Sequence, residues 1–324
     1  MVGPPAPGAS AFFFRRVALA FLRRAVVTAA MDFSVVIVSL NGRARIAMPL
    51  DALRRCDPPA AQVIVVDNGS DDGLSEFVKK NYPEVDLVRA PQNLGFAGGN
   101  NLGIVNARGE IIVLLNDDTD PEADWLAPIA AAFAQHSRFG LAGCQLLYPD
   151  SGKVQHLGGV VHDNGLTDHA GWGGEAGVFA KGEIIPSDYV TGAAMAIRRR
   201  VLSDIGFLDA GFWPIYFEET DFCARAKRAG WEIAVVPESR VVHHESQTTG
   251  RLSPKFLRTY HRNRIRYLIK NRRVMEWGRT FRAEARWMAI NAPWDHLWAC
   301  ALAYAWAPFQ LAEVAVMRLR RARR

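Results

Sequence analysis

The sequence has 324 residues, of which 49% are apolar, so it can bury the core of one large α/β domain or of two small ones. Its four cysteines are scattered without a C-x-x-C pair, which argues against a disulfide framework and a cysteine-based zinc site. The net charge of +6 is uneven: residues 1–30 carry +4 and residues 251–324 carry +13, which leaves −11 on residues 31–250. Such an acidic body argues against a nucleic-acid-binding protein.

Residues 1–30 combine four arginines with aromatic and aliphatic residues and contain no acidic residue. This mixture is typical of a segment that lies on a membrane, with apolar side chains at the acyl boundary and arginines among the headgroups. The arginines interrupt the apolar stretch, so the segment does not resemble a signal peptide. We interpret it as a basic amphipathic extension, or as the product of a misassigned start, before a domain that begins at Met31.

Residues 33–116 alternate short apolar runs with helical patterns. Near-continuous apolar runs are typical of strands in a parallel sheet that is covered on both faces. This alternation predicts an open, mostly parallel α/β sheet with ligand at the carboxyl ends of its strands. The predicted strands are 33–40, 62–66, 85–89 and 110–115, and the predicted helices are 43–55, bent near Pro49, and 95–107.

The rest of the chain predicts a less regular arrangement. Pro121 suits the first turn of a helix that runs to Gln135, and the Gly- and His-rich segment 140–186 predicts extended pieces and loops. Gly230 suits the end of a helix. The further predicted strands are 188–197, 233–236 and 240–243, and the further predicted helices are 218–229 and 253–271.

Polar residues follow three of the predicted strands where each strand ends. Ser39 and Asn41 follow the first, Asp67 opens the sequence DNGSDDG after the second, and Asp117 and Asp118 follow the fourth. The carboxyl ends of parallel strands meet at one edge of a sheet, so these side chains could form a nucleotide-sugar and metal site. Carboxylate oxygens suit hard divalent cations, which a diphosphate can share. Taken singly, each group also suits a turn or a helix cap.

The order of the motifs along the chain resembles glycosyltransferase family 2, especially its bacterial rhamnosyltransferase-like members. The resemblance covers residues 33–250, and no phosphate-binding G-x-G-x-x-G motif follows the first strand to suggest a Rossmann dehydrogenase instead. It implies the GT-A fold, in which an open, mostly parallel sheet flanked by helices binds a nucleotide-diphosphate sugar. The motifs are VVIVSLNG, VVDNGSDDG, NLGFAGGNNLG, LLNDDTD, VTGAAMAIRR, FEETDFCARAKRAGW and VVHHES.

The resemblance implies a donor site. Asp67 should hydrogen-bond the nucleotide base, with Ser39 and Asn41 beside it, while Asp117 should face the ribose and Asp118 should ligate Mn2+ or Mg2+. Many rhamnosyltransferase-like members have proline where Asp117 stands, so the resemblance does not specify rhamnose as the donor sugar. The residues that should lie beside the nucleoside and the diphosphate are Asn93, Gly95 and Gly98.

The resemblance also implies a catalytic base in the sequence FEETD. Glu219 should take the proton of the acceptor hydroxyl, with Glu218 as the competitor. From spacing alone, these glutamates equally suit a helix start, where the dipole favours acidic residues. Asp221 and Arg225, four residues apart, predict an ion pair on the helix surface.

Two further motifs complete the expected site. His243 and His244 end a strand and point to opposite faces, and the resemblance favours His243 as the second metal ligand. The alternative is a histidine of the core or the surface. The segment Thr191-Gly192-Ala193 resembles the acceptor-side strand of the family, where a glycine would permit the close approach of a sugar.

The apolar run 297–317 is only marginally long enough to span a membrane, and it is followed by arginines. We expect a helix that lies on an anionic membrane surface, with packing on the protein's own body as the alternative. The predicted organisation is therefore an N-terminal extension (1–30), a GT-A catalytic domain (31–250) and a basic, amphipathic C-terminal helical region that associates with the membrane (251–324).

The sequence thus predicts a metal-dependent, inverting glycosyltransferase on the cytoplasmic side of the cell membrane. Its expected partners are a dTDP- or UDP-sugar, a cell-envelope glycan or lipid-linked acceptor, and an anionic membrane surface, without nucleic acid. A sugar-nucleotide pyrophosphorylase is one alternative, although the chain reads NGRAR where such enzymes carry a Gly- and Arg-rich loop. A non-catalytic binding relative is the other.

Overall fold

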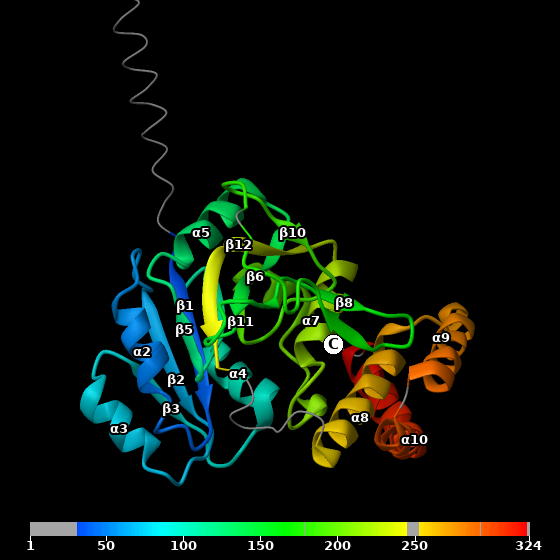
Figure 1. The fold of residues 1–324 in the computed structure, drawn as a ribbon. Helices are drawn as coiled ribbons and strands as arrows, with labels where there is room; N and C mark the ends of the chain where they lie inside the picture. The colour runs from blue at the N-terminus through cyan, green and yellow to red at the C-terminus, as the bar shows by residue number, and fades with distance from the viewer. Residues whose placement is uncertain (1–30, 178, 245–252, 292, 323–324) are drawn as a thin grey trace, which may run out of the picture. The chain divides into compact units, whose positions relative to one another are not determined.

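The structure is a computed structural model that describes residues 31–177, 179–244, 253–291 and 293–322. The chain divides into the units Met1–Met31 and Asp32–Arg324, and the description that follows concerns the second. The predicted extension at residues 1–30 lies outside the described residues. Within the second unit, a mixed sheet carries helices on both faces (Figure 1).

The elements have the following bounds. The strands are β1 (Phe33–Ser39), β2 (Gln62–Asp67), β3 (Asp86–Arg89), β4 (Ile111–Asn116), β5 (Thr119–Pro121), β6 (Phe139–Leu147), β7 (Val154–His156), β8 (Gly159–Val161), β9 (Thr167–His169), β10 (Ile185–Pro186), β11 (Ala194–Arg198) and β12 (Glu232–His243). The α-helices are α2 (Ala47–Arg54), α3 (Leu74–Asn81), α4 (Gly95–Asn106), α5 (Leu126–Gln135), α6 (Arg199–Ile205), α7 (Glu218–Arg228), α8 (Pro254–Asn271), α9 (Trp277–Asn291) and α10 (Trp294–Ala322).

The main sheet has the strand order β10-β12-β6-β11-β4-β1-β2-β3. Strands β4, β1, β2 and β3 are parallel, and β11 runs antiparallel between β4 and β6. Strand β12 pairs parallel with β6, and β5 pairs antiparallel with β12. The predicted open, mostly parallel sheet with flanking helices is therefore confirmed.

The core explains why the apolar runs became central strands. Strands β1, β4 and β6 are almost completely buried, because α4, α6 and α7 pack on one face of the sheet and α5 on the other. Helix α4 lies close to the sheet because it presents glycines to it: a Cβ atom at Gly103 would stand 2.2 Å from a methyl group of Val36, and one at Gly99 would stand 2.6 Å from Val38. This packing fixes the start of α4 beside the end of β1.

Some predicted elements need correction. Pro121 does not open a helix: it ends β5, which pairs with β12, and the helix begins only at Leu126. Proline can end an edge strand as readily as it can begin a helix, so the residue alone did not discriminate between them. Helix α2 begins at Ala47, which places Pro49 in its first turn, where no bend is needed. The loop-rich segment from residue 140 begins with the long buried strand β6.

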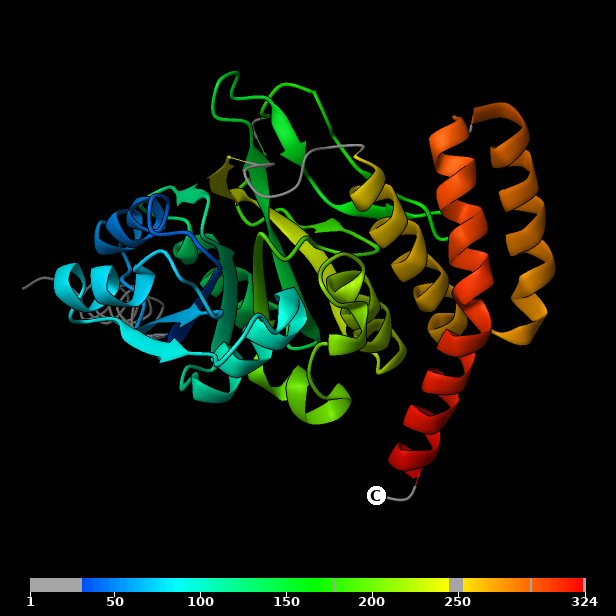
Figure 2. The same ribbon diagram turned by 90° about the horizontal axis from the view of Figure 1, so that it is seen from below.

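The C-terminal helices pack onto the body of the protein. Helix α8 begins with Ser253, whose hydroxyl accepts a hydrogen bond from the Phe256 N–H at 3.2 Å. It contacts α7 on one side and α10 on the other, and α9 contacts both α8 and α10. Figure 2 shows the three helices side by side. By length and composition, one helix of the described residues, Trp294–Leu319 within α10, could cross a membrane.

Candidate functional site

The ends of β1 and β4 meet around Asp117. Its Oδ2 accepts a hydrogen bond from the Ser39 hydroxyl at 2.5 Å and lies 3.1 Å from a guanidinium nitrogen of Arg45. Burial raises the pKa of Asp117 above its usual value, although Ser39 and Arg45 oppose this by favouring the charged form. A Cβ atom at Gly42 would stand 2.0 Å from the Ser39 hydroxyl, so only glycine leaves room for this contact.

Asp118 and His243 face each other although they are 125 residues apart in the sequence. The Oδ1 of Asp118 is buried, has no hydrogen-bond donor among the described residues, and lies 3.2 Å from Nε2 of His243. The other ring nitrogen, Nδ1, lies 2.6 Å from Oε1 of Gln155, which can only accept a hydrogen bond. Nδ1 therefore donates to Gln155, and Nε2 faces the carboxylate of Asp118, with Asn116 Nδ2 3.4 Å away.

A carboxylate oxygen and an imidazole nitrogen that lie 3.2 Å apart suit a divalent cation, because both groups are common metal ligands. The residues present thus fit a metal ion. Within the parts of the chain that the structure describes, no three His, Cys, Asp or Glu side chains gather closely enough to hold a metal by themselves. A cation here would therefore need further ligands from a bound molecule.

The predicted base-binding residue Asp67 is completely buried. Its Oδ1 accepts from the Ser70 N–H at 2.8 Å, and its Oδ2 accepts from the Ser75 hydroxyl and from Arg89 at 2.9 Å. Burial alone would raise the pKa of Asp67, but these hydrogen bonds and the Arg89 charge bring it below its usual value. Contact with a nucleotide base stays a prediction.

The loop after β2 is joined to its neighbours on both sides. Asn41, which has a φ of 51°, donates its N–H to the Ser70 hydroxyl at 2.9 Å and accepts from the Asp71 N–H at 3.0 Å. Asn68 donates to Asn93 Oδ1 at 3.3 Å and accepts from the Leu94 N–H at 3.0 Å. The segments that follow β1, β2 and β3, which carry the residues predicted to lie beside the nucleoside, are therefore neighbours in the structure.

Glycines fix the start of α4 for reasons of packing. Gly95 has a φ of 71°, and a Cβ atom there would stand 2.7 Å from the Trp213 ring. A Cβ atom at Gly98 would stand 2.8 Å from the Leu94 side chain. The Phe96 N–H donates to the carbonyl of Pro214 at 2.8 Å, which connects this turn to the loop before α7. A role beside a diphosphate remains a prediction for Gly95 and Gly98.

The two candidate bases open α7 after a strained turn. Tyr216 and Phe217 have φ values of 83° and 75°, a left-handed conformation that is uncommon for side chains of this size. Asn263 of α8 secures the turn, because its side-chain amide donates to the carbonyls of Phe212, Ile215 and Tyr216 at 2.6, 2.9 and 3.1 Å. The structure thus maintains an unfavourable backbone directly before Glu218, as is common at functional sites.

Glu218 and Glu219 differ in environment. The side chain of Glu218 is buried, and its Oε2 has no hydrogen-bond partner among the described residues, whereas Glu219 is half-buried. Burial raises the pKa of Glu219 to about 7. Burial and the neighbouring Glu219 raise the pKa of Glu218 further above its usual value. Glu219 therefore ionises first and is the more accessible of the two.

The ion pair expected on the surface of α7 is instead buried, which corrects the sequence-based expectation. Arg225 Nε lies 2.9 Å from Asp221 Oδ2, and the Asp221 side chain is fully enclosed. The same carboxylate accepts from Lys270 at 2.8 Å and from Asn271 at 2.9 Å, both on α8. The four-residue spacing predicted the ion pair of Asp221 and Arg225, but it could not predict that α8 covers that pair.

The segment Thr191-Gly192-Ala193 lies between the two halves of the candidate site. A Cβ atom at Gly192 would stand 2.6 Å from the Phe96 ring, so the glycine is required by α4. The carbonyl of Ala193 accepts from the Asn116 N–H at 3.0 Å. A continuous set of contacts therefore runs from the metal-binding candidates through Ala193, Gly192 and Phe96 to the turn before Glu218. Contact of this segment with an acceptor stays a prediction.

Three residues important to this geometry escaped the sequence analysis: Arg45, Gln155 and Asn263. Arg45 stands four residues after Asn41, in a segment that was expected to be helical. Gln155 and Asn263 reach the site from β7 and α8, at 88 and about 50 residues from their partners. These three residues could have been identified only as polar residues at buried positions. A single sequence does not show which positions are buried.

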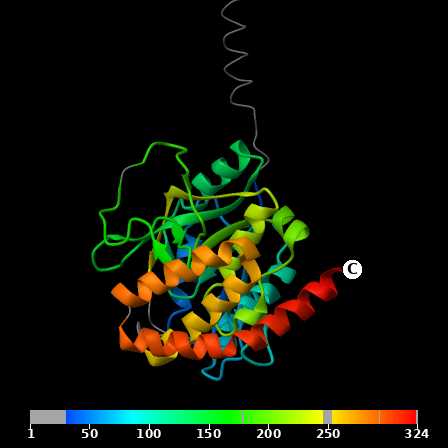
Figure 3. The same cartoon turned by 90° about the vertical axis from the view of Figure 1, so that its right-hand side faces the viewer.

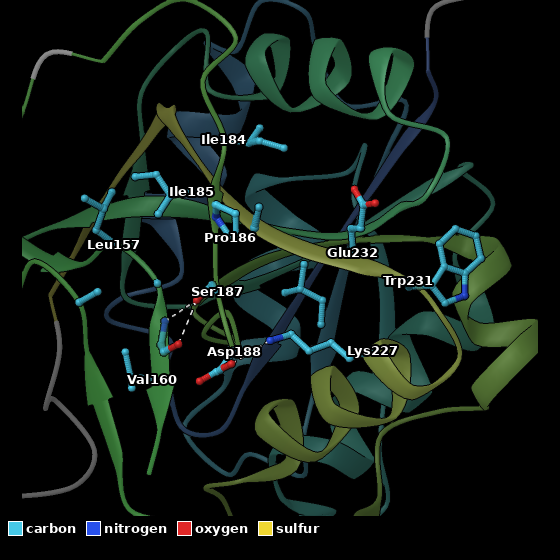
Figure 4. A pocket seen from close by; sticks show the side chains of 15 residues that line it. Leu157, Val160, Ile184, Ile185, Pro186, Ser187, Asp188, Lys227, Trp231 and Glu232 are labelled. Carbon is cyan, nitrogen blue, oxygen red and sulfur yellow. Dashed lines mark hydrogen bonds and ion pairs between the residues drawn. The ribbon is translucent and has the colours of Figure 1, made fainter.

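A cavity of about 500 Å3 lies elsewhere, at the amino-terminal end of β12 (Figure 4). Leu157, Ile185 and Trp231 line it, and the ion pair of Asp188 with Lys227, 2.9 Å long, stands at its edge. It contains none of the predicted site residues. Strand β12 ends at His243, so this cavity and the metal-binding candidates are at opposite ends of the same strand.

The chain is similar to known proteins in sequence and in fold. Residues 30–288 match the family described as "Glycosyltransferase like family 2". The chain is 31% identical over 216 residues to the uncharacterized protein y4gI of Sinorhizobium fredii, in an alignment of 64% of this chain and 24% of that protein. It is 25% identical over 250 residues to the N-acetylglucosaminyl-diphospho-decaprenol L-rhamnosyltransferase of Mycobacterium tuberculosis, in an alignment of 69% of this chain and 78% of that enzyme.

Among solved structures, the fold is similar to that of GalNAc-T7, determined with UDP, GalNAc and Mn2+. The TM-score is 0.65 at 17% sequence identity, with 81% of this chain and 52% of that chain covered. The chain therefore spans about a quarter of the length of y4gI and about half of GalNAc-T7. At this level of identity, the likeness to GalNAc-T7 concerns the GT-A fold alone.

Proposed function

The chain belongs to glycosyltransferase-like family 2, and from that premise we propose that it transfers a sugar, with inversion, from a nucleotide-diphosphate sugar to a cell-envelope acceptor. The observation that carries the proposal is the pair Asp118 and His243, which face each other beside the Ser39–Asp117 contact at the carboxyl ends of β1 and β4. Ligands of open α/β sheets bind at such an edge.

The donor would lie across the ends of β1, β2 and β4. Asp117 would contact the ribose and Arg45 the diphosphate, and Asn41 and Asp67 would border the base. Arg45 is a fitting phosphate ligand because a guanidinium donates two hydrogen bonds in a fixed geometry. We propose a dTDP- or UDP-sugar as the donor class, which includes activated rhamnose.

The metal would be Mn2+ or Mg2+, held by Asp118 and His243 together with the donor's diphosphate. When bound, such a cation neutralises charge that develops on the leaving diphosphate. Imidazole as a ligand favours Mn2+ over Mg2+. Asp118 Oδ1 and His243 Nε2 lie 3.2 Å apart, which supports the proposal that both would bind one cation.

Gln155 would fix the orientation of His243, and its removal should weaken metal binding. In Gln155→Leu no acceptor remains for the Nδ1 proton, so the ring can rotate or change tautomer. We expect the affinity for Mn2+, measured in the presence of UDP by the electron paramagnetic resonance of free Mn2+, to fall about 10- to 100-fold. Gln155→Glu keeps an acceptor and should stay close to wild type. Equal affinity in Gln155→Leu would contradict the role.

The reaction would be a single displacement. Glu219 accepts the proton of the acceptor hydroxyl while that oxygen attacks the anomeric carbon, and the bond to the nucleoside diphosphate breaks on the opposite side. One base and no second nucleophile give inversion of the anomeric configuration. A pKa of about 7 suits a base that must be ionised and still accept a proton near neutral pH.

The acceptor and the cellular location follow from the charge pattern and the relatives. The basic ends of the chain favour the anionic inner face of the cell membrane, where a cytoplasmic enzyme could reach a lipid-linked glycan. The relative from M. tuberculosis acts, by its name, on N-acetylglucosaminyl-diphospho-decaprenol. We therefore propose a lipid-linked or other envelope glycan as the acceptor, and a C-terminal region from residue 251 that serves membrane association.

A panel of nucleotide-sugars, with and without Mn2+, provides the test. A ligand that binds only the folded protein raises its melting temperature, so one class of donor should stabilise the protein in a Mn2+-dependent way. Release of the nucleoside diphosphate would then distinguish a transferase from a non-catalytic relative. Formation of a nucleotide-sugar from a nucleoside triphosphate and a sugar phosphate would instead support the pyrophosphorylase alternative, which family membership disfavours.

A further inference from the structure

Helix α10 has two unlike faces. One face packs on α8 and α9, and its buried side chains come close to the body of the protein. The opposite face carries large apolar side chains that are mostly exposed: Trp294 at 86%, Trp298 at 68% and Phe309 at 66%, with Val316 further along. Their spacing places all four on one side of a helix. The buried face is formed by Ala299, Cys300, Ala303, Gln310 and Val314.

The outward face lacks the polar residues that a water-exposed helix normally carries. Residues 296–312 contain no Asp, Glu, Lys or Arg. Exposed apolar residues scattered singly are ordinary on a protein surface, but a stripe of tryptophan and phenylalanine along one helix marks an interaction surface. Tryptophan is typical of side chains at the boundary between lipid and water.

Polar contacts fasten the inner face of α10 to the body. Glu284 of α9 accepts two buried hydrogen bonds from the guanidinium of Arg264 of α8, at 2.6 and 2.7 Å. The Tyr304 hydroxyl of α10 donates to the same carboxylate at 3.0 Å. Gln310 donates to the Arg262 carbonyl at 3.0 Å. If α10 crossed a bilayer, the contacts of Tyr304 and Gln310 would break and their polar groups would lose these partners away from water, which is unfavourable. The helix is therefore built to stay on α8.

Arginines lie on the neighbouring helix α9 and follow the apolar stripe in the sequence. Helix α9 exposes Arg282 and Arg286 and has a single acidic residue, Glu284, which is buried in its contact with Arg264. The last seven residues of the sequence, from Arg318, include five arginines and no acidic residue. Apolar side chains bordered by arginines match the acyl boundary and the anionic headgroups of a bilayer. Figure 3 shows α8, α9 and α10 together on one side of the molecule.

We propose that the outward face of α10 is a docking surface for an anionic lipid bilayer, on which the helix lies without spanning it. The proposal deepens the proposed function, on which it rests for the membrane location of the acceptor. The apolar stripe supplies most of the binding, and the arginines of α9 and of the C-terminal end supply the preference for anionic lipid.

Co-sedimentation of the full chain with vesicles tests the proposal. We expect the protein to bind vesicles of phosphatidylcholine with phosphatidylglycerol and to bind phosphatidylcholine alone much more weakly. The triple variant Trp298→Ser, Phe309→Ser and Val316→Ser should partition at least about 10-fold less, because each change removes apolar surface from the membrane contact. Val105→Ser, an exposed apolar residue on α4, is the matched control and should bind as wild type.

Two further measurements distinguish a helix that lies on the bilayer from one that spans it or that forms a dimer interface. Alkaline carbonate should release the chain from cell membranes, and its retention in the pellet would show a spanning helix and overturn the proposal. Unchanged vesicle binding by the triple variant would also overturn it. So would a wild-type protein that binds no vesicles and forms dimers in light scattering, if the triple variant abolishes those dimers. Mn2+-dependent stabilisation by the donor should be equal in the triple variant and wild type, so a failure of docking is distinguishable from a failure of the proposed enzyme.

Discussion

Glu219→Gln is expected to lower kcat about 100- to 10,000-fold, with little change in the stabilisation that a nucleotide-sugar donor gives. The amide has nearly the shape of the carboxylate but cannot accept the acceptor's proton, and general base catalysis contributes a factor of this size. Glu219 is half-buried, whereas Glu218 is buried, so the change should leave the fold intact. Release of nucleoside diphosphate over time measures the effect.

The pH dependence provides an independent check of this assignment. Burial raises the pKa of Glu219 to about 7, and only the carboxylate form accepts a proton. The wild-type rate should therefore fall as the pH drops below about 7 and level off above it, and Glu219→Gln should lose that dependence. Glu218→Gln serves as the comparison. If it loses as much activity as Glu219→Gln and retains the donor's thermal stabilisation, the base is Glu218 and our assignment is wrong.

Asp118→Ala should abolish both transfer and Mn2+-dependent donor binding. The buried Oδ1 of Asp118 is one of the two protein atoms oriented toward the proposed cation, and removal of such a ligand leaves His243 alone. We expect Mn2+ affinity in the presence of UDP to decrease at least about 100-fold, given that even outer-shell partners of a metal contribute 10- to 100-fold. Isothermal titration with Mn2+ and UDP measures this loss directly.

Asp120→Ala is the matched control for this experiment. Asp120 stands two residues further along, is more exposed, and pairs loosely with Arg55 at 3.6 Å. It should retain metal binding and activity close to wild type, because surface pairs of this kind contribute little. Wild-type Mn2+ affinity in Asp118→Ala would exclude a metal site at Asp118 and His243, and it would require a transferase mechanism without this cation.

The first half of the fold was predictable from the sequence because its strands are buried on both faces. The runs around Val36, Val65 and Leu114 are apolar without interruption, and this pattern has few other structural solutions. Helix α7 was predictable because its acidic start and Gly230 mark both ends. The prediction that Pro121 begins a helix was wrong because Pro121 pairs with Val241 of β12, which lies 120 residues away in the sequence.

The candidate site was predictable only to the extent that sheet topology determines it. Residues that follow parallel strands gather at one edge of the sheet, which is how Ser39 and Asp117 came within 2.5 Å of each other. The supporting contacts depend on tertiary packing instead. Neither the Gln155 contact with His243 nor the burial of Asp221 has a local signature, because each depends on an element packed from a distant part of the chain.

Helix α8 touches the turn before Glu218 through Asn263, and it touches α10, which we propose rests on lipid, through Arg262 and Arg264. A rigid element shared in this way would set a constant height of the reaction centre above the headgroups. The enzyme would then select acceptors by the distance of the reacting hydroxyl from the membrane. Only a hydroxyl at the same height above the headgroups as the catalytic base would reach it. Chain-length preference would follow from architecture, with no dedicated recognition residue.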